Sequence, residues 1–476
     1  MFFFSNLEIM EKPKRILFLD LMRVIALFMM IQGHTTYDFL DLSIRDGHST
    51  GIKIWTSLRG YTAPFFMMVS GAVFTFLMLS QEKNDGTNPR VRAGINRIFT
   101  LLFWGYLLNF PVYEFKQIFT SEGLNHFLSA KVGETLLTIL WISGCLYIYK
   151  IITNSEMNFE ENEIKNIFRE DAIKHTRFRT ALFNKNYFKL EHRKKRLMSS
   201  VFWGVIISIP FLIISNVLSK EEMQRAFRVD VLHIIALGLL TIMLVYFISN
   251  HNKGWMAIIY FILMLIIISM FPLINNVDLS NLPIFVAPYL NDYDTKSMFP
   301  LTPWLAYIFA GALLGLWLNY EIKKDDFEKK IGVKLTIIGL SFIFLSILGD
   351  KFERFYFGRS YFWHDSPNLI YHRIGIVLSV GAAMAFLSLY VRDLPKFMKQ
   401  MSRNTLWLYV GHLIVIYQIV KPIIGYHTRF NVPITIICIV CMFILMYLQT
   451  RIIIYVQQNS GYLELYKKIF SKKKTI

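Results

Sequence analysis

The residues best suited to chemistry lie in one apolar stretch near the start of the chain, Lys14 to Leu40. Its pattern predicts a transmembrane helix that carries Asp20, Arg23 and His34. The step from Arg23 to His34 makes about three turns at about 100° per residue, so both share one face about 16 Å apart, and Asp20 joins it. A charge near mid-bilayer costs on the order of 3 kcal/mol or more, so this face is expected to line a bundle interior or a wet cavity. A histidine there can act as a general base or a nucleophile.

Structural roles would explain the same residues without any chemistry. Asp20 and Arg23 could form an ion pair at the membrane interface, with His34 capping the far end of the helix. Two further histidines, His233 and His412, each stand alone in an apolar helix. Lone polar side chains in such helices commonly bond to a neighbouring helix, and we expect that role for both.

The composition is that of a membrane protein. The 476 residues are 54% apolar, include 42 Phe and are only 18% charged, whereas charged residues usually make up about a quarter of a soluble chain. The net charge of +18 does not indicate nucleic-acid binding, because Lys and Arg alternate with apolar spans instead of forming one surface. The N-terminus lacks the charged start and small-residue cleavage site of a secretory signal, so the first helix is expected to remain as an anchor.

The cysteines indicate little. Cys145, Cys438 and Cys441 all lie in apolar runs. The last two have C-x-x-C spacing within a predicted helix but lack a second ligand pair, so we expect neither a metal site nor a disulfide framework.

Apolar runs of at least about 17 residues, long enough to span a membrane as helices, recur along the whole chain. They lie near residues 16–34, 60–79, 98–115, 134–152, 200–217, 231–249, 256–274, 301–319, 333–349, 369–391, 405–420 and 432–456. We therefore predict an all-α, polytopic transmembrane bundle with about 12 spans, forming one domain over residues 1–476. Lys and Arg are more frequent in the tails and in the connections after even-numbered spans. This bias predicts that both termini are cytoplasmic, in a multi-pass protein of the plasma membrane.

A polar insertion at about 151–199 interrupts this pattern, and Lys and Arg outnumber Asp and Glu there. We expect one or two amphipathic helices along the inner leaflet, where each basic residue near anionic lipid contributes about 1 kcal/mol. Membrane lipid is thus an expected partner.

Several stretches carry a family resemblance. An Arg followed by ten residues and then His on the first helix resembles the signature of the integral-membrane acyltransferase type three family. Four later stretches are more similar to a neighbouring group, the heparan-alpha-glucosaminide N-acetyltransferase-like proteins. They are RGYTAPFFMMVSGAVFTF at Arg59 to Phe76, VDVLHIIALGLL at Val229 to Leu240, MFPLTPWLAYIFAGALLG at Met298 to Gly315, and NTLWLYVGHLIVIY at Asn404 to Tyr417.

The resemblance implies that an acyl group, expected to be acetyl, moves from cytoplasmic acyl-CoA to an extracytoplasmic glycan or glycolipid acceptor. His34 is the expected catalytic residue. Arg23 would orient the donor or polarise its thioester carbonyl, and Asp20 would hold Arg23. Relatives with heparan-sulfate activity use a histidine in the first external loop, so His48 remains a second candidate for the base.

A basic cluster after the second predicted span could bind the phosphates of coenzyme A. Arg90, Arg92 and Arg97 lie within NPRVRAGINRIF, and guanidinium groups form strong, often bidentate contacts with phosphate. The related acyltransferases place a basic cluster at the start of the third helix, which supports this role. Positive-inside topology would explain the same three residues without a ligand.

Two external polar regions are expected to bind the acceptor. The first follows His34 and includes Asp38 and Arg59. The second, between Glu353 and Gly375, mixes aromatic residues with polar ones, namely Arg359, His364, His372 and Arg373. Aromatic faces and paired polar groups suit a sugar or lipid head group, but they equally suit an aromatic belt at the membrane interface.

A different class of protein would also explain charged residues within the membrane and twelve spans. A transporter or flippase for a glycolipid or organic anion could use Asp20, Arg23 and His34 as a substrate or proton relay. Transporters commonly contain related halves, and none is recognisable in this chain, which argues against that alternative. An inactive membrane scaffold is a third interpretation.

Overall fold

A computed structural model describes most of the chain as helices. It covers residues 16–47, 49–82, 88–109, 143, 197–198, 200–202, 204–205, 220–275, 277–279, 281–282, 284–293, 295–362, 365–391 and 393–458. Apart from an isolated parallel bridge between Leu40 and Phe430, these residues contain helices and connecting segments and no strand, which confirms the all-α prediction. Several predicted features lie wholly or mostly outside these residues. They are His48, His364, the predicted spans at 134–152 and 200–217, and the insertion at 151–199.

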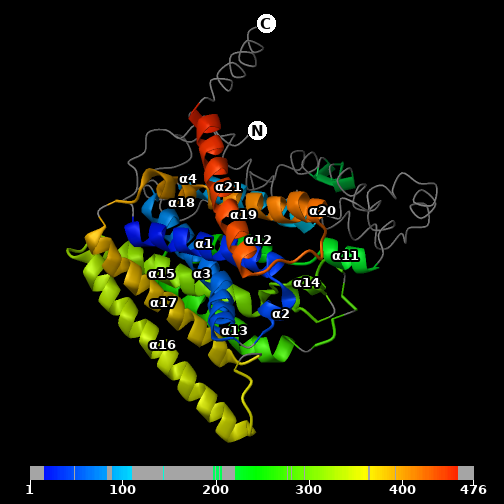
Figure 1. Ribbon diagram of the computed structural model, residues 1–476. Helices are drawn as coiled ribbons and strands as arrows, with labels where there is room; N and C mark the ends of the chain where they lie inside the picture. Colours follow the sequence, from blue (N-terminus) through cyan, green and yellow to red (C-terminus); the bar gives the residue numbers. More distant parts are fainter. Residues whose placement is uncertain are drawn as a thin grey trace. The chain divides into compact units, whose positions relative to one another are not determined.

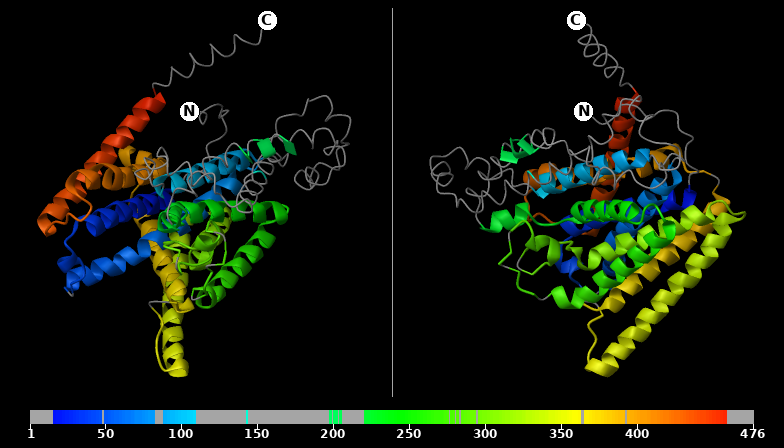
Figure 2. Two further views of the ribbon diagram at one scale, coloured as in Figure 1. Left: turned by 90° about the vertical axis from the view of Figure 1, so that its right-hand side faces the viewer. Right: turned by 180° about the vertical axis from the view of Figure 1, so that it is seen from behind.

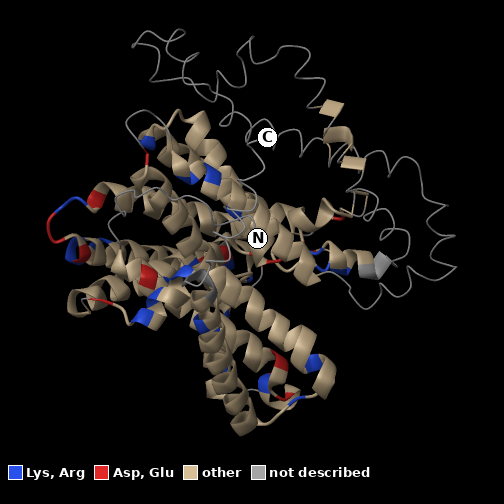
Figure 3. Ribbon diagram, turned by 90° about the horizontal axis from the view of Figure 1, so that it is seen from above, with Lys and Arg blue, Asp and Glu red and all other residues tan. Residues whose placement is uncertain are grey.

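Nine of the described helices are long and apolar enough to cross a membrane, which confirms a polytopic architecture. They are Leu17–Phe39, Thr50–Ser80, Val231–Ile248, Lys253–Ile274, Leu301–Glu321, Phe327–Phe357, Pro367–Tyr390, Thr405–Ile424 and Val432–Tyr455. Charged residues are scattered along helices that consist mostly of uncharged residues (Figure 3). The count of twelve spans and the side of each terminus remain predictions.

The helices fall into two compact units, each assembled from segments that are distant in sequence. The first unit comprises Met1–Leu77, Tyr260–Leu273 and Thr302–Ile476, and the second comprises Met78–Ile259 and Ile274–Leu301. Organisation of residues 1–476 as one domain remains a prediction.

The first unit contains most of the helices seen in Figure 1. Its described elements are α1 (Leu17–Phe39), α2 (Leu42–Arg45), α3 (Thr50–Ser80) up to Leu77, part of α13 (Lys253–Ile274), α15 (Leu301–Glu321), α16 (Phe327–Phe357), α17 (Pro367–Tyr390), α18 (Lys396–Arg403), α19 (Thr405–Leu413), the π-helix η2 (Ile414–Val420), α20 (Lys421–Ile424) and α21 (Val432–Gln458).

Helices α16 and α17 form a long antiparallel pair (Figure 2). Glycines let the two backbones approach closely. A Cβ atom on Gly339 would lie 2.9 Å from the Gly375 carbonyl oxygen, and one on Gly375 would lie 2.7 Å from the Gly339 carbonyl oxygen. Both distances are too short for any side chain, so glycine is required at this crossing.

Helices α3 and α15 cross through a second set of glycines. A Cβ on Gly311 would lie 2.0 Å from the Met68 carbonyl oxygen, and a Cβ on Gly71 would lie 2.3 Å from the Ile308 carbonyl oxygen. One turn further along α15, a Cβ on Gly315 would lie 2.4 Å from the Ala72 carbonyl oxygen. Because lipid supplies little hydrophobic drive for helix association, such close backbone packing is a main source of stability in a membrane bundle.

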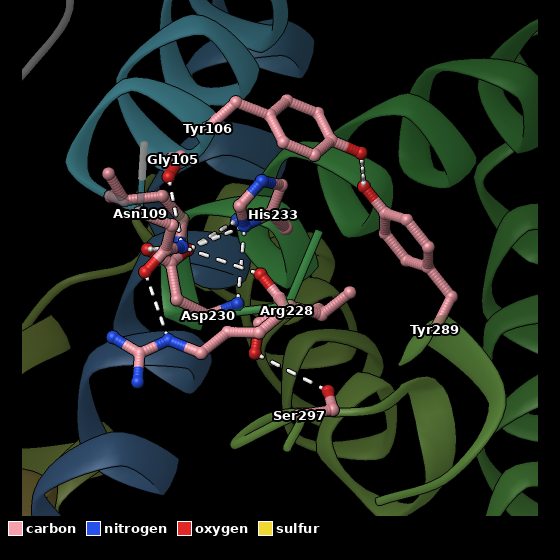
Figure 4. A network of polar contacts seen from close by, with 10 residues as sticks. Gly105, Tyr106, Asn109, Arg228, Asp230, His233, Tyr289 and Ser297 are labelled. Carbon is pink, nitrogen blue, oxygen red and sulfur yellow. Dashed lines mark hydrogen bonds and ion pairs between the residues drawn. The ribbon is translucent and has the colours of Figure 1, made fainter. Parts of the chain in front are cut away.

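The second unit contains α4 (Pro89–Asn109), α11 (Lys220–Ala226), α12 (Val231–Ile248), the first part of α13 and α14 (Ala287–Leu290). A polar network joins α4 to the start of α12 (Figure 4). The Asp230 carboxylate accepts hydrogen bonds from the Leu232 and His233 amides at 2.9 and 3.3 Å, as expected of an N-cap residue. The His233 ring lies 2.7 Å from that carboxylate and packs directly over Gly105 of α4. His233 therefore bonds to its own helix cap, so the prediction of a bond to another helix is wrong for this residue.

The crossing of α3 and α15 can be tested by adding a single methyl group to one of its glycines. We expect Gly311→Ala to destabilise the protein by about 1–3 kcal/mol, the usual cost of overpacking, because the new Cβ meets backbone atoms that cannot move without displacing α3. Thermal unfolding of the purified protein in detergent measures this effect. The matched control is Gly33→Ala in α1, where no atom outside the local helix lies within 4 Å of the new Cβ. Equal melting temperatures for both variants would contradict the prediction.

Candidate active site

The polar residues of α1 pair with the C-terminal helices along the whole length of α1. Each pair joins residues nearly four hundred positions apart in the sequence. The pairs are Asp20 with the Ser402 hydroxyl at 2.8 Å, His34 with His412 at 3.0 Å, and Asp38 with the Tyr417 hydroxyl at 2.6 Å. Since the residue numbers rise together on both sides, α1 runs parallel to the segment from α18 to η2.

The two histidines form a directed chain of hydrogen bonds. His412 Nδ1 lies 2.9 Å from the Leu408 carbonyl oxygen, which can only accept, so this nitrogen carries the proton. A neutral His412 must then accept at Nε2, and the 3.0 Å contact makes His34 Nδ1 the donor. His34 Nε2 is left as an unprotonated nitrogen with no hydrogen-bond partner in the described part of the chain. That is the tautomer a general base requires.

This contact also confirms the sequence prediction for His412, which was expected to bond to another helix. His412 is fully buried, and its ring stacks on that of His34 with centroids 5.2 Å apart. The sequence showed His412 as a lone imidazole in an apolar span, which predicted an interhelical bond but did not indicate His34 as the partner.

A cationic and aromatic group lies beside the C-terminal end of α1. The Arg59 guanidinium lies 3.9 Å from the centre of the Tyr37 ring and 5.7 Å from that of Trp55, distances typical of cation–π contacts. The Trp55 indole donates to Gln32 Oε1 at 3.1 Å. Tyr37, which contacts Arg59, lies about one turn after His34 on α1, so this group adjoins the paired histidines.

An open cavity of about 550 Å³ is built around these residues. It is lined by Tyr37, Arg45, Asp46, Gly47, Ile52, Lys53, Trp55, Thr56, Ser57 and Arg59. Arg45 bonds to Asp46 at 3.0 Å, and this hydrogen bond raises the pKa of Arg45. Lys53 and Arg59 form no ion pair with any residue the structure describes, so the cavity is net positive.

Asp20 and Arg23 lie at the opposite end of α1 from this cavity. Their side chains form an ion pair at 3.5 Å, with 8% of the Asp20 side chain and 27% of the Arg23 side chain exposed. This ion pair agrees equally with both interpretations of the sequence, a catalytic Arg23 held by Asp20 and a structural pair at the membrane interface. Eleven residues of helix, about 16 Å, separate Arg23 from His34, so the two cannot act on the same atom directly.

Asp38 is buried, and its neighbourhood explains how α1 ends. The Asp38 carbonyl oxygen accepts hydrogen bonds from Lys421 Nζ at 2.8 Å and from the Arg429 guanidinium. Lys421 is only 2% exposed and also donates to the carbonyl oxygens of Tyr426 and Thr428, each at 3.2 Å. Two cations therefore satisfy the C-terminal carbonyl end of α1, where the helix dipole favours positive charge.

The three arginines of the basic cluster lie on α4 in the second unit. Arg90 and Arg97 are seven residues apart and share one face of the helix, whereas Arg92 lies on nearly the opposite face. Arg90 donates to Gln81 Oε1 at 2.5 Å and is half-buried, while Arg92 and Arg97 are exposed. The helix brings two of the three predicted phosphate ligands together and separates the third.

The second predicted acceptor region is divided by the fold. His372 and Arg373 lie in the first two turns of α17, inside the first unit. Arg359 is exposed in the connection between α16 and α17 and stacks on Tyr361 at 4.5 Å. His48 and His364 lie outside the described residues. Within the described part of the chain, no group of three His, Cys, Asp or Glu side chains could hold a metal ion.

These features define a polytopic all-α membrane protein in which His34 pairs with the buried His412 and a polar cavity lies at the C-terminal end of α1. The chain matches the family described as heparan-alpha-glucosaminide N-acetyltransferase, catalytic, over residues 15–144 and 178–357. The match covers more than half of the chain, so the protein belongs to this family and to the wider group of membrane acyltransferases. Comparisons with curated proteins and with solved structures gave no significant match.

The role of Lys421 can be tested by removing its charge. We expect Lys421→Met to destabilise the protein by about 1–3 kcal/mol, because the carbonyl oxygens of Tyr426 and Thr428 would lose a buried donor. The measurement is thermal unfolding in detergent, and the control is Lys396→Met at an exposed position of α18. If Lys421→Met unfolds at the same temperature as the control, the Lys421 cation does not stabilise the carbonyl groups that it contacts.

Proposed function

We propose that the protein transfers an acetyl group from acetyl-CoA to a hydroxyl or amine of a glycan or glycolipid acceptor, with His34 as the general base. Membership of an acetyltransferase family supports the reaction class. The observation that carries the proposal is the chain from Leu408 through His412 to His34, which leaves His34 Nε2 unprotonated. His412 is a positioning residue in this scheme, because it acts only through His34.

The transfer itself needs one proton carrier. His34 Nε2 takes the proton of the acceptor O–H or N–H as the acceptor atom attacks the thioester carbonyl carbon. The C–S bond then breaks, and the thiolate of coenzyme A receives the proton back from His34. During this cycle His34 becomes an imidazolium, and its Nδ1–H bond to His412 strengthens because a charged donor forms a stronger hydrogen bond than a neutral one.

The cavity beside His34 supports a role in acceptor binding. The flat Trp55 ring suits the face of a sugar ring, and Lys53, Arg59 and Ser57 supply hydrogen-bond donors for hydroxyl groups. His48 follows Gly47 of the cavity lining directly in the sequence, so it remains the alternative base. Asp38 is better suited to a structural role than to acceptor binding, because it is buried and bonded to Tyr417.

The donor is proposed to bind through its phosphates at Arg90 and Arg97, which share a face of α4. Arg92 would contribute long-range attraction only, since it lies on another face. With both termini cytoplasmic, as the charge bias predicts, this cluster would face the cytoplasm and the acceptor would bind from outside the plasma membrane. Arg23, held by Asp20, would then orient the donor's arm within the bundle.

The histidine pair gives a graded prediction. His34→Gln removes the base and should lower kcat by on the order of a hundredfold or more. His412→Leu should lower kcat by a smaller factor, roughly tenfold to a hundredfold, because the base remains but its tautomer is no longer fixed. KM for the acceptor should be nearly unchanged in both. The assay is transfer of labelled acetyl from acetyl-CoA by the purified protein.

Two controls accompany these variants. His251→Gln changes a histidine of the second unit and should leave turnover normal. His48→Gln tests the alternative base, and loss of turnover there with near-normal turnover for His34→Gln would move the reaction centre to the external loop. Normal turnover in both His34→Gln and His48→Gln would refute a histidine-based mechanism.

The face of α4 gives a prediction for the donor. Replacing Arg90 and Arg97 together by Gln should weaken acetyl-CoA binding by roughly tenfold or more, since charge-assisted contacts to phosphate contribute about 1.5–3 kcal/mol each. Arg92→Gln should have a much smaller effect. Isothermal titration with acetyl-CoA measures both affinities. Equal affinities in wild type and the double variant would leave these residues with a topological role alone.

A further inference from the structure

A second polar cluster lies in the first unit, around Arg373. This residue lies in the second turn of α17, within a membrane-spanning helix, and forms no ion pair with any residue that the structure describes. Its guanidinium lies 5.9 Å from the centre of the Trp304 ring of α15. It also approaches α3, where a Cβ on Gly60 would lie 3.9 Å from its Nη2 atom.

A buried hydroxyl without a hydrogen bond of good geometry lies in the same cluster. Tyr307 of α15 is 0% exposed, and its hydroxyl lies next to the Arg373 guanidinium without forming a hydrogen bond of good geometry with any described residue. Tyr61 of α3 belongs to the same cluster, because its ring contacts that of His372, the residue before Arg373, and because the preceding Gly60 lies next to the Arg373 guanidinium. Buried hydroxyl groups in proteins are nearly always hydrogen-bonded, so an orphan here needs an explanation.

His372 closes one side of the cluster. Its Nδ1 lies 3.1 Å from the Ser346 hydroxyl of α16, and its ring lies 6.2 Å from that of Tyr61 and 5.5 Å from that of Phe362. The polar side chains that these contacts place in the cluster thus come from four helices. Those named here carry hydroxyl groups and an imidazole.

An unpaired cation in a membrane span is costly, and its usual explanation is an anionic partner. The cluster presents guanidinium donors from α17 and phenol donors from α3 and α15. Donors that converge from several helices suit an anion with three or four oxygen atoms better than a planar carboxylate with two. We propose that Arg373, Tyr307 and Tyr61 bind a phosphate group, carried by a lipid head group or by a soluble phosphate ester.

This site deepens the acceptor role that the sequence predicts for Arg373 and rests on the proposed function, but its test measures binding and not transfer. Arg59 and Tyr61 are two residues apart on α3, so they point to different sides of the helix. Arg59 faces Tyr37 at the His34 cavity, whereas Tyr61 faces His372. The phosphate site is therefore separate from the cavity, and α3 lies between them.

The full-length protein in neutral detergent should bind dioleoylphosphatidylglycerol more tightly than dioleoylglycerol, which lacks a phosphate. Arg373→Gln should weaken phosphatidylglycerol binding by roughly tenfold or more, the effect expected for a charge-assisted contact. The matched control, Arg403→Gln, removes the same charge from an exposed position at the end of α18 and should leave the affinity unchanged. A second arm titrates glycerol 3-phosphate into the same variants.

Tyr307→Phe distinguishes a ligand-binding role of the Tyr307 hydroxyl from a structural role, and it removes no charge. Because the hydroxyl forms no hydrogen bond of good geometry in the described chain, its loss should leave the melting temperature of the ligand-free protein unchanged and weaken phosphate binding by several-fold. Glycerol 3-phosphate binding that depends on Arg373 and Tyr307 would identify a soluble ester as the source. The proposal is overturned if neither probe distinguishes Arg373→Gln from Arg403→Gln, or if Tyr307→Phe destabilises the free protein and leaves binding intact. Acetyl transfer by His34 is not measured here, so failure in this assay leaves that reaction untouched.

Discussion

A polar group within a membrane must find its partner inside the protein, and this constraint organises the first unit. The α1 helix carries Asp20, His34 and Asp38 along one side, and each meets a side chain from the segment between α18 and η2. In lipid an unsatisfied group of this kind costs several kcal/mol. The three contacts therefore fix the register of α1 against the C-terminal helices, and the apolar contacts of the same helices have no comparable directionality.

The same constraint explains the mixture of structural and chemical roles on one helix. Asp20 and Asp38 have their partners at the two ends of the pairing, where Ser402, Tyr417 and Lys421 satisfy them. His34 lies between these anchors, and its partner His412 satisfies one ring nitrogen and leaves the other without a proton. Rigid anchors on either side hold this nitrogen in place, which is the preorganisation that a catalytic base requires.

The sequence predicted the elements well and their partners poorly, for a physical reason. Span positions follow from apolar runs, so the predicted runs at 231–249 and 256–274 match α12 and α13 within a few residues. The ends of α3 and α16 were missed, because both helices continue into polar residues that a hydropathy pattern excludes. His34 and His412 are 378 residues apart, and periodicity along one helix carries no information about which other helix faces it.

The glycines are a second case in which the sequence does not show which helices pack together. Gly71, Gly311 and Gly315 stand in apolar spans, where a sequence pattern gives them only a general tendency to lie at helix contacts. The structure pairs α3 with α15 through them, and α3 thereby holds Tyr61 against the residues of α15 and α17 while Arg59 remains on the side of α1. The glycine crossing thus determines which side chains can meet at each polar cluster, although no glycine takes part in the chemistry of either one.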